Sequence, residues 1–307
     1  MLDMALEIAQ TDPTFEDIAT KFFEHFIIIS ESLNQIGEDW VGAWDEEEGF
    51  FYDILAMPDN SYTPLKVRSL VGLTTMFATL RLERSRLENL PDFKRRLEWY
   101  RQYREEHEMY LVIEDLAEDK DILLSLLPNE RLKKMLKTLL DEQEFLSPVG
   151  IRSLSKIHET PYKITIAGKE FGLKYEPAES TIGLFGGNSN WRGPIWMPMN
   201  YLNIQSLRQF HEYFEDTLKV ECPTQSGNYM NLGQVADDLS SRLISLFQSD
   251  AAGHRPIHGT DDLYKTDPHF KDLILFYEYF HGCSGRGVGA SHQTGWTGVV
   301  AELINRK

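Results

Sequence analysis

WRGPIWMPMNY, residues 191–201, is the stretch that decides which fold and which kind of site to expect. Trp191 and Trp196 offer flat apolar rings on which the C–H face of a sugar can pack. Arg192 and Asn200 offer hydrogen bonds to hydroxyl groups. Gly193-Pro194 is typical of a turn that leads into a helix, with the proline at its first position. The stretch therefore predicts a sugar-binding cleft at the start of a helix. The alternative is a tryptophan-rich helix start packed into the core, because buried aromatic residues are common.

A second informative stretch runs from Phe276 to Gly298 near the end of the chain. It begins FYEYFHG, in which Glu278 is a lone carboxylate among aromatic residues. A glycine-rich loop follows, and then Trp296 at a further helix start. A carboxylate in such surroundings suits a general acid or base. The alternative is a structural glutamate paired with Arg286 or His281.

Four motifs, in their order along the chain, resemble glycoside hydrolase family 63 and its mannosylglycerate hydrolase-like relatives. They are W-D-E-x-x-G-F-x-Y-D (Trp44–Asp53), N-W-R-G-P-I-W-x-x-x-N-Y (Asn190–Tyr201), E-Y-x-x-G (Glu278–Gly282) and G-W-T-G (Gly295–Gly298). The resemblance covers nearly the whole chain. It implies a toroidal (α/α)6 barrel of the six-hairpin glycosidase type, with the active site at one mouth. It also implies hydrolysis of α-glucosidic or α-mannosidic bonds with inversion of configuration, and an oligosaccharide or small glycoside as substrate.

Inversion requires two carboxyl groups, one that protonates the leaving oxygen and one that activates water. The resemblance assigns the general base to Glu278, and it assigns the general acid to an aspartate that precedes the first helix of this chain. We therefore expect a C-terminal portion of a longer enzyme, with its acid upstream. The substrate-binding residues that we expect are Trp191, Arg192, Trp196, Asn200, Trp296, Asp45, Tyr52, His292 and Gln293. For His292 and Gln293, a structural role is the equal alternative.

The segment around Asp45 has three interpretations. Tyr52, with Phe50 and Phe51, is expected to line a sugar subsite, and Asp45 is expected to contact substrate or support the cleft. A substitute general acid at Asp45 is the less favoured interpretation. Because Asp45 opens the acidic run DEEEG, a solvated turn is the third.

The composition narrows the classes of binding partner to be expected. The formal charge of −17 disfavours binding to nucleic acid and to anionic membranes. We find no signal peptide and no apolar run of about 20 residues, so a soluble cytoplasmic protein is expected. The two cysteines, Cys222 and Cys283, form neither a disulfide framework nor a metal-ligand pattern. The histidines have no zinc spacing, and no cofactor or metal is expected.

Helical patterns dominate, and we predict one all-α domain over residues 1–307, an (α/α)6 barrel that is incomplete at its N-terminus. Residues 147–190 are predicted as a loop and β-hairpin insertion, with strands at 162–166 and 171–175. The predicted helices cover residues 1–9, 12–35, 64–82, 92–106, 111–116, 128–141, 194–214, 232–248, 268–280 and 296–304. Two other classes of protein stay open. They are a noncatalytic carbohydrate-binding domain and a helical scaffold in which the tryptophans are buried.

Overall fold

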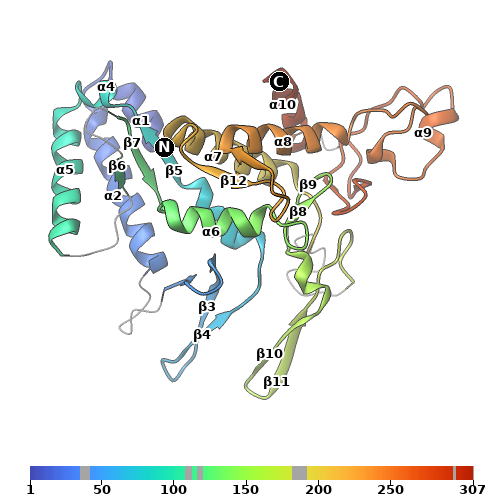
Figure 1. The fold of residues 1–307 in the computed structure, drawn as a ribbon, viewed down its shortest axis with the longest axis horizontal. Helices are drawn as coiled ribbons and strands as arrows, with labels where there is room; N and C mark the ends of the chain where they lie inside the picture. The colour runs from blue at the N-terminus through green and yellow to red at the C-terminus, as the bar shows by residue number, and fades with distance from the viewer. Residues whose placement is uncertain (35–41, 108–112, 116–119, 182–191, 293–294, 307) are drawn as a thin grey trace. The chain divides into compact units, whose positions relative to one another are not determined.

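The computed structural model describes residues 1–34, 42–107, 113–115, 120–181, 192–292 and 295–306 (Figure 1). The chain divides into two compact units. Unit 1 consists of Met1–Leu65, Thr74–Lys134 and Glu212–Phe214, and unit 2 consists of Lys66–Leu73, Met135–His211 and Glu215–Lys307.

Unit 1 is built on two long helices. Its elements are α1 (Leu2–Ala9), α2 (Phe15–Asn34), β1 (Trp44–Asp45), β2 (Phe50–Phe51), β3 (Asp53–Ala56), β4 (Tyr62–Leu65), a 3-10 turn (Thr74–Phe77), β5 (Thr79–Leu82), α4 (Arg84–Leu87), α5 (Pro91–Glu106), β6 (Ile113–Asp115) and β7 (Ile122–Ser125). In the core, Phe23 of α2 meets Phe93 and Tyr100 of α5 edge to face, with ring centroids 5.7 and 5.5 Å apart. Apolar residues spaced by three, four or seven positions lie on one face of a helix, so each of these helices turns one apolar face toward the other.

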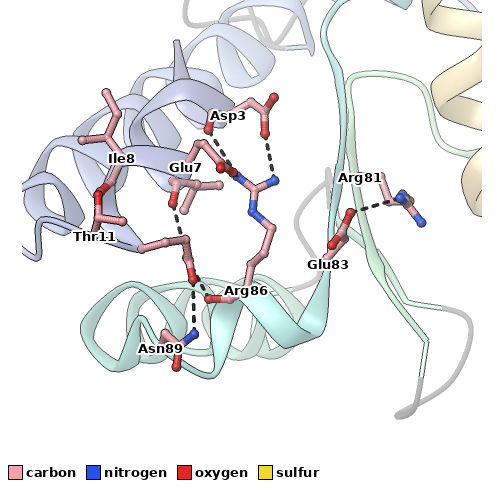
Figure 2. A network of polar contacts seen from close by, with 10 residues as sticks. Asp3, Glu7, Ile8, Thr11, Arg81, Glu83, Arg86 and Asn89 are labelled. Atoms are coloured by element: carbon pink, nitrogen blue, oxygen red, sulfur yellow. Dashed lines mark hydrogen bonds and ion pairs between the residues drawn. The ribbon is translucent and has the colours of Figure 1, made fainter.

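A three-stranded antiparallel sheet, in the order β5-β7-β6, completes this core. The central strand β7 is buried along its whole length. The short helix α4 shares the apolar core with α1 through Leu87, and polar contacts also join the two helices (Figure 2). There Arg86 reaches Asp3 at 3.1 Å and Glu7 at 3.2 Å, and its carbonyl oxygen accepts a hydrogen bond from Gln10.

Unit 2 combines helices with short antiparallel hairpins. Its elements are α3 (Leu70–Leu73), β8 (Leu146–Ser147), β9 (Gly150–Ile151), a 3-10 turn (Lys156–Glu159), β10 (Tyr162–Ile166), β11 (Lys169–Leu173), β12 (Lys219–Glu221), β13 (Tyr229–Asn231), α8 (Leu232–Ser245), a 3-10 turn (Pro256–His258), α9 (Leu263–Thr266), β14 (Tyr279–Phe280), β15 (Gly287–Val288), a 3-10 turn (Trp296–Val299) and α10 (Val300–Asn305). Helix α8 starts at a capping box, in which Asn231 and Gln234 satisfy each other's backbone N–H groups. Helices α6 (Asn129–Leu139) and α7 (Met197–Phe214) contribute residues to both units.

Most of the predicted elements are confirmed. They are the first two helices (α1, α2), the helix after Pro91 (α5), the helix after Pro128 (α6), α7, α8, the C-terminal helix after Trp296 and the hairpin β10–β11. The turn at Ala167 and Gly168 has positive φ at both residues, as a two-residue hairpin turn requires. Helix α7 begins at Met197 and not at Pro194, because Ile195 pairs with Phe280 of β14.

Three predicted helices are wrong. Residues 64–82 form the end of β4, the short α3, a 3-10 turn and β5, since Leu80 pairs with Leu124 across the sheet. In 111–116, the described part forms β6. Residues 268–280 contain no helix, and the segment ends in β14, where Tyr279 pairs with Val288. The partner of β5 is about 40 residues away, whereas β6 and β14 pair with strands only seven to eleven residues further on. In all three segments the periodic apolar pattern favoured a helix, but pairing with another strand decided the structure.

The fold is thus rich in helices with small antiparallel hairpins, which is compatible with a family 63 domain. The toroid, the single-domain boundary and the cytoplasmic location stay predictions. Among the described residues, no helix is both long enough and apolar enough to cross a membrane.

Candidate active site

Glu278 lies immediately before β14, and backbone contacts fix its position. Its N–H donates to the carbonyl of Ala290 over 2.9 Å, and the N–H of Ala290 donates to Oε2 of Glu278 over 3.3 Å. One residue of the glycine-rich loop therefore holds both the backbone and the carboxylate of Glu278. The side chain is half-buried, which leaves the carboxylate within reach of solvent.

Gly289 provides the space for this carboxylate. Its φ of +74° is in the left-handed region, and a Cβ atom there would lie 2.6 Å from Oε2 of Glu278. Any larger residue would therefore combine backbone strain with a clash against the carboxylate. This close approach gives one of the loop's glycines a defined role.

Three aromatic rings pack beside Glu278. Trp196 stacks on Tyr279 with centroids 5.0 Å apart and planes at 19°, and it meets Trp296 edge to face at 5.6 Å. The indole Nε1 of Trp296 donates to the carbonyl oxygen of Glu278 over 2.9 Å. Trp196 and Tyr279 are buried, and Trp296 is partly exposed. Trp296 thus offers the more accessible face, and the other two rings support it.

The two sequence motifs meet through β-bridges. Ile195 exchanges hydrogen bonds with Phe280, at 2.8 and 2.9 Å, and it also bridges to Arg152. The strand entering α7 thereby lies against the strand that follows Glu278. Segments about 80 residues apart are joined at the backbone, which brings Trp196 to the same cluster as Glu278.

Arg192 is buried and faces Glu176, with Nη1 3.6 Å from Oε2. Burial lowers the pKa of the guanidinium, and the charge of Glu176 opposes that change. Burial also disfavours the ionised form of Glu176, but hydrogen bonds from Thr181 outweigh it and hold the pKa of this carboxyl below its ordinary value. Arg192 is thus part of an internal ion pair at the start of the tryptophan motif.

Asn200 is buried in α7, and its amide bonds to backbone groups. Oδ1 accepts from the N–H of Ile151 over 2.6 Å, and Nδ2 donates to the carbonyl oxygens of Ile151 and Trp196, each over 3.0 Å. These bonds attach the first turn of α7 to β9. They also tie the carbonyl of Trp196 to the side chain of Asn200, and the sugar contact predicted for Asn200 stays a prediction.

Asp45 and Tyr52 belong to unit 1, whereas Glu278 belongs to unit 2. Oδ1 of Asp45 accepts hydrogen bonds from the N–H groups of Glu47 and Glu48, at 3.0 and 2.9 Å, as the turn interpretation anticipates. Tyr52 is buried, and its hydroxyl donates to the carboxylate of Glu48.

Three further residues were predicted as sugar contacts. His292 is exposed, and its Nδ1 lies 3.1 Å from Oγ of Ser291. Trp191 and Gln293 lie outside the described residues.

Tyr279, Glu179 and Arg286 complete the described site. Burial raises the pKa of Tyr279, and the charges of Glu179 and Glu278 raise it further while Arg286 lowers it. Neither Tyr279 nor Glu179 was among the site residues predicted from the sequence, although Tyr279 directly follows the predicted base. Arg286 pairs with Glu179 at 3.7 Å, and not with Glu278 as one sequence interpretation suggested.

Two cavities of about 290 and 300 Å³ lie in unit 1, and neither is lined by a predicted site residue. The candidate site therefore rests on the contacts around Glu278 and not on a cavity. In the described residues, no group of three or more His, Cys, Asp or Glu side chains has an arrangement that would hold a metal ion.

A carboxylate beside exposed aromatic surface is compatible with a glycoside hydrolase site, where a carboxyl group of this kind acts as base or nucleophile. The resemblance to glycoside hydrolase family 63 is confirmed, because residues 86–232 match the glycosyl hydrolase family 63 C-terminal domain. That range includes the tryptophan motif and α7, and it ends before Glu278.

Three relatives match this chain, and two of them are named as glucosidases. An uncharacterized protein of Saccharomyces cerevisiae is 45% identical over 99% of this chain, which spans 29% of that protein. A probable mannosyl-oligosaccharide glucosidase of Schizosaccharomyces pombe is 26% identical over 60% of the chain and 17% of its own length. The mannosyl-oligosaccharide glucosidase of Saccharomyces cerevisiae is 26% identical over 65% of the chain and 18% of its own length. The chain thus spans less than a third of each relative.

Proposed function

We propose that this chain carries the general-base part of a glycoside hydrolase site, with Glu278 as the residue that activates water. The observation that carries the proposal is the fixed position of Glu278, whose carboxylate accepts from Ala290 beside Trp196, Tyr279 and Trp296. An ionised carboxylate in this position can accept a proton from a water molecule on one face of a bound sugar. The partly exposed ring of Trp296 provides an apolar surface for that sugar.

The proposed reaction is hydrolysis of an α-glucosidic or α-mannosidic bond with inversion. In such a reaction water attacks opposite the leaving group while a second carboxyl protonates the leaving oxygen. The two carboxyls are separated by roughly 6.5–9.5 Å to leave room for the water. The names of two relatives favour a glucoside at the cleaved bond. His292, Trp191 and Gln293 are kept as proposed sugar contacts.

The general acid is proposed to come from outside this chain. Asp45 is the less favoured source, because its carboxylate already accepts two backbone hydrogen bonds within its own turn. The engagement of Asp45 also favours a second candidate function, a domain that binds carbohydrate without cleaving it. Both functions require a sugar to bind beside Trp296, and they differ in turnover.

The test compares the wild type with Glu278→Gln in a longer protein that contains this chain together with the general acid proposed to lie outside it. Binding is measured by tryptophan fluorescence on titration with α-linked disaccharides of glucose and of mannose. Hydrolysis is followed by proton NMR, which reports the anomer released first. We expect both proteins to bind sugar with similar affinity, and only the wild type to release the inverted β-anomer. Glu170→Gln on the exposed hairpin β10–β11 is the matched control.

Three outcomes separate the candidates. A fall of several orders of magnitude in turnover for Glu278→Gln, with affinity retained, supports the hydrolase. Sugar binding without turnover in the wild type of the longer protein supports the noncatalytic domain and contradicts the hydrolase. The absence of binding by any of the disaccharides contradicts both and leaves the helical scaffold.

A further inference from the structure

We propose that Arg286 and Glu179 form an ion-pair clamp that positions the Glu278 carboxylate, an inference that rests on the proposed function of Glu278. Arg286 occupies the connection between β14 and β15, where its carbonyl oxygen accepts a hydrogen bond from the N–H of His281 over 2.8 Å. Its Nη2 lies 3.7 Å from Oε2 of Glu179. The pair thus connects the hairpin that follows Glu278 to a segment about a hundred residues earlier in the chain.

The backbone fixes the segment that carries Glu179. The carbonyl oxygen of Pro177 accepts from the N–H of Gly282 over 2.7 Å, and Ala178 packs against the cluster of Trp196, Tyr279 and Val288. Glu179 is the next residue, so it is held at the edge of the aromatic cluster. Its side chain is about two thirds exposed, which leaves it free to pair with an arginine at the surface.

The stem of Arg286 is fixed by a third segment. A Cβ atom at Gly259 would lie 2.8 Å from both Cγ and Cδ of Arg286, so the stem rests against the bare backbone of this glycine. Gly259 has a φ of +59°, where glycine is favoured. Arg286 therefore contacts three separate segments, and its guanidinium has a defined direction toward Glu179.

Electrostatics explains why a cation is required here. Glu179 and Glu278 both act on the Tyr279 phenol with negative charge, and Arg286 acts on the same group with positive charge. Arg286 is the cation that pairs with the carboxylate of Glu179, next to the hairpin that Glu278 precedes. Without Arg286, the hairpin would lose its link to Glu179, and the contact between Glu278 and Ala290, which flank this hairpin, would be held less firmly.

The clamp predicts a loss of turnover larger than any loss of sugar affinity. A displacement of the base of about 1 Å is enough for a loss of up to about a hundredfold in rate. For Arg286→Met and Glu179→Gln we therefore expect kcat to fall about tenfold or more, with KM changed less than about threefold. Because the pair is exposed to solvent, the wild type should also lose rate as salt rises, and the variants should not.

The experiment measures kcat, KM and hydrogen exchange in the wild type, Arg286→Met, Glu179→Gln and the double exchange Glu179→Arg with Arg286→Glu. Exchange of the peptide spanning residues 282–292 reports the Ala290 amide without depending on turnover. Asp237→Asn is the matched control, because it breaks an ion pair of 3.6 Å with a similarly exposed carboxylate in the same unit. A thermal unfolding scan separates local from global effects.

We expect faster hydrogen exchange in that peptide for both single variants. In the charge-swapped double variant, Glu179→Arg with Arg286→Glu, we expect it to slow again, and in the control we expect no change. Unchanged exchange and unchanged kcat in Arg286→Met would overturn the clamp, as would a double exchange no better than the single variants. The proposed function fails by a separate result, full turnover in Glu278→Gln. The exchange measurement still decides for or against the clamp in that case.

Discussion

The indole Nε1 of Trp296 donates a hydrogen bond of 2.9 Å to the backbone carbonyl of Glu278. The neighbouring hydroxyl of Thr297 donates to the carbonyl of Tyr277 over 2.6 Å. Two successive residues of the C-terminal 3-10 turn thus hold two successive residues of the segment that ends in the proposed base. The tryptophan of the G-W-T-G motif thus holds the backbone of Glu278, and its ring is the surface that we propose for the sugar.

Trp296→Phe separates these two purposes. Phenylalanine keeps an apolar ring but cannot donate to the carbonyl of Glu278, so the segment loses about 1 kcal/mol of restraint. We expect kcat to fall roughly fivefold to tenfold with sugar affinity nearly unchanged, and Trp296→Ala to lose affinity as well. Steady-state kinetics and fluorescence titration measure both quantities. Trp99→Phe, an exposed position in unit 1, is the control and should change neither. Equal loss of affinity in the Phe and Ala variants would contradict the division of roles.

Gly289→Ala tests the space beside the carboxylate. The substituted Cβ would lie 2.6 Å from Oε2 of Glu278, so we expect turnover to fall at least tenfold. Gly253→Ala is a close control, because Gly253 has a φ of +79° and a Cβ atom there would have no neighbouring atom within 4 Å. Both variants bear the strain of about 1 kcal/mol for alanine at positive φ, and only Gly289→Ala touches Glu278. Chemical denaturation and kinetics together make the comparison. Equal losses of activity in the two variants would show that strain alone is responsible.

Asn200→Ala tests whether this residue is a structural link. The variant leaves the N–H and carbonyl of Ile151 without their partner, and we expect a loss of about 3 kcal/mol in the free energy of unfolding. Asn203→Ala, one turn along α7, removes a single hydrogen bond to Met199 and should lose about 1 kcal/mol in hydrogen bonding. Urea denaturation measures the loss in the free energy of unfolding for each variant, provided that all proteins share the same m-value. A stable Asn200→Ala variant with weakened sugar affinity would instead support the sugar contact predicted from the sequence.

His158 predicts a pH dependence of stability. Burial, followed by the charge of Arg68, lowers the pKa of His158 from 6.5 to about 4. Its Nε2 accepts from the N–H of Arg68 over 2.9 Å, which requires the neutral ring. Between these two pKa values the unfolded chain binds the proton and the folded protein does not. Stability from this residue is therefore complete above pH 6.5 and is lost as the pH falls toward 4, by up to about 3 kcal/mol.

His158→Gln removes this titration and keeps a hydrogen-bond acceptor. We expect the variant to show a flatter dependence of the free energy of unfolding on pH between 4 and 6.5 than the wild type. Burial raises the pKa of nearby Glu144, which acts in the opposite direction, and the difference between the two proteins isolates the histidine. Parallel pH curves for the two proteins would rule out the assigned role of His158.

Helices with strong local signals could be predicted from sequence. Pro91 stands at the first position of α5 and Phe93, Leu97 and Tyr100 follow on its buried face, so both the start and the face were readable. The hairpin β10–β11 was equally local, since its turn and both strands lie within twelve residues. In both cases the determining contacts are a few residues apart.

The segments predicted wrongly as helices are strands whose partners lie at different distances along the chain. Thr79–Leu82 is a strand because β7 lies beside it, about 40 residues further along the chain. Tyr279–Phe280 is a strand because Gly287, Val288 and Ile195 pair with it. A periodic apolar pattern in one segment carries no information about which other segment offers free backbone groups.

For the site, the sequence by itself determined the chemistry: a lone carboxylate in an aromatic run, a glycine loop after it, and tryptophans at two helix starts. Residue type alone fixes what a carboxylate or an indole can do. Only the tertiary structure decided which of these groups act together. It brought Trp196 to Glu278 through the Ile195–Phe280 bridge, and it used the polar atoms of Asn200 for backbone contacts. It also paired Arg286 with Glu179. These pairings depend on hydrogen bonds and burial between segments far apart in the chain, and such contacts exist only after the chain has folded.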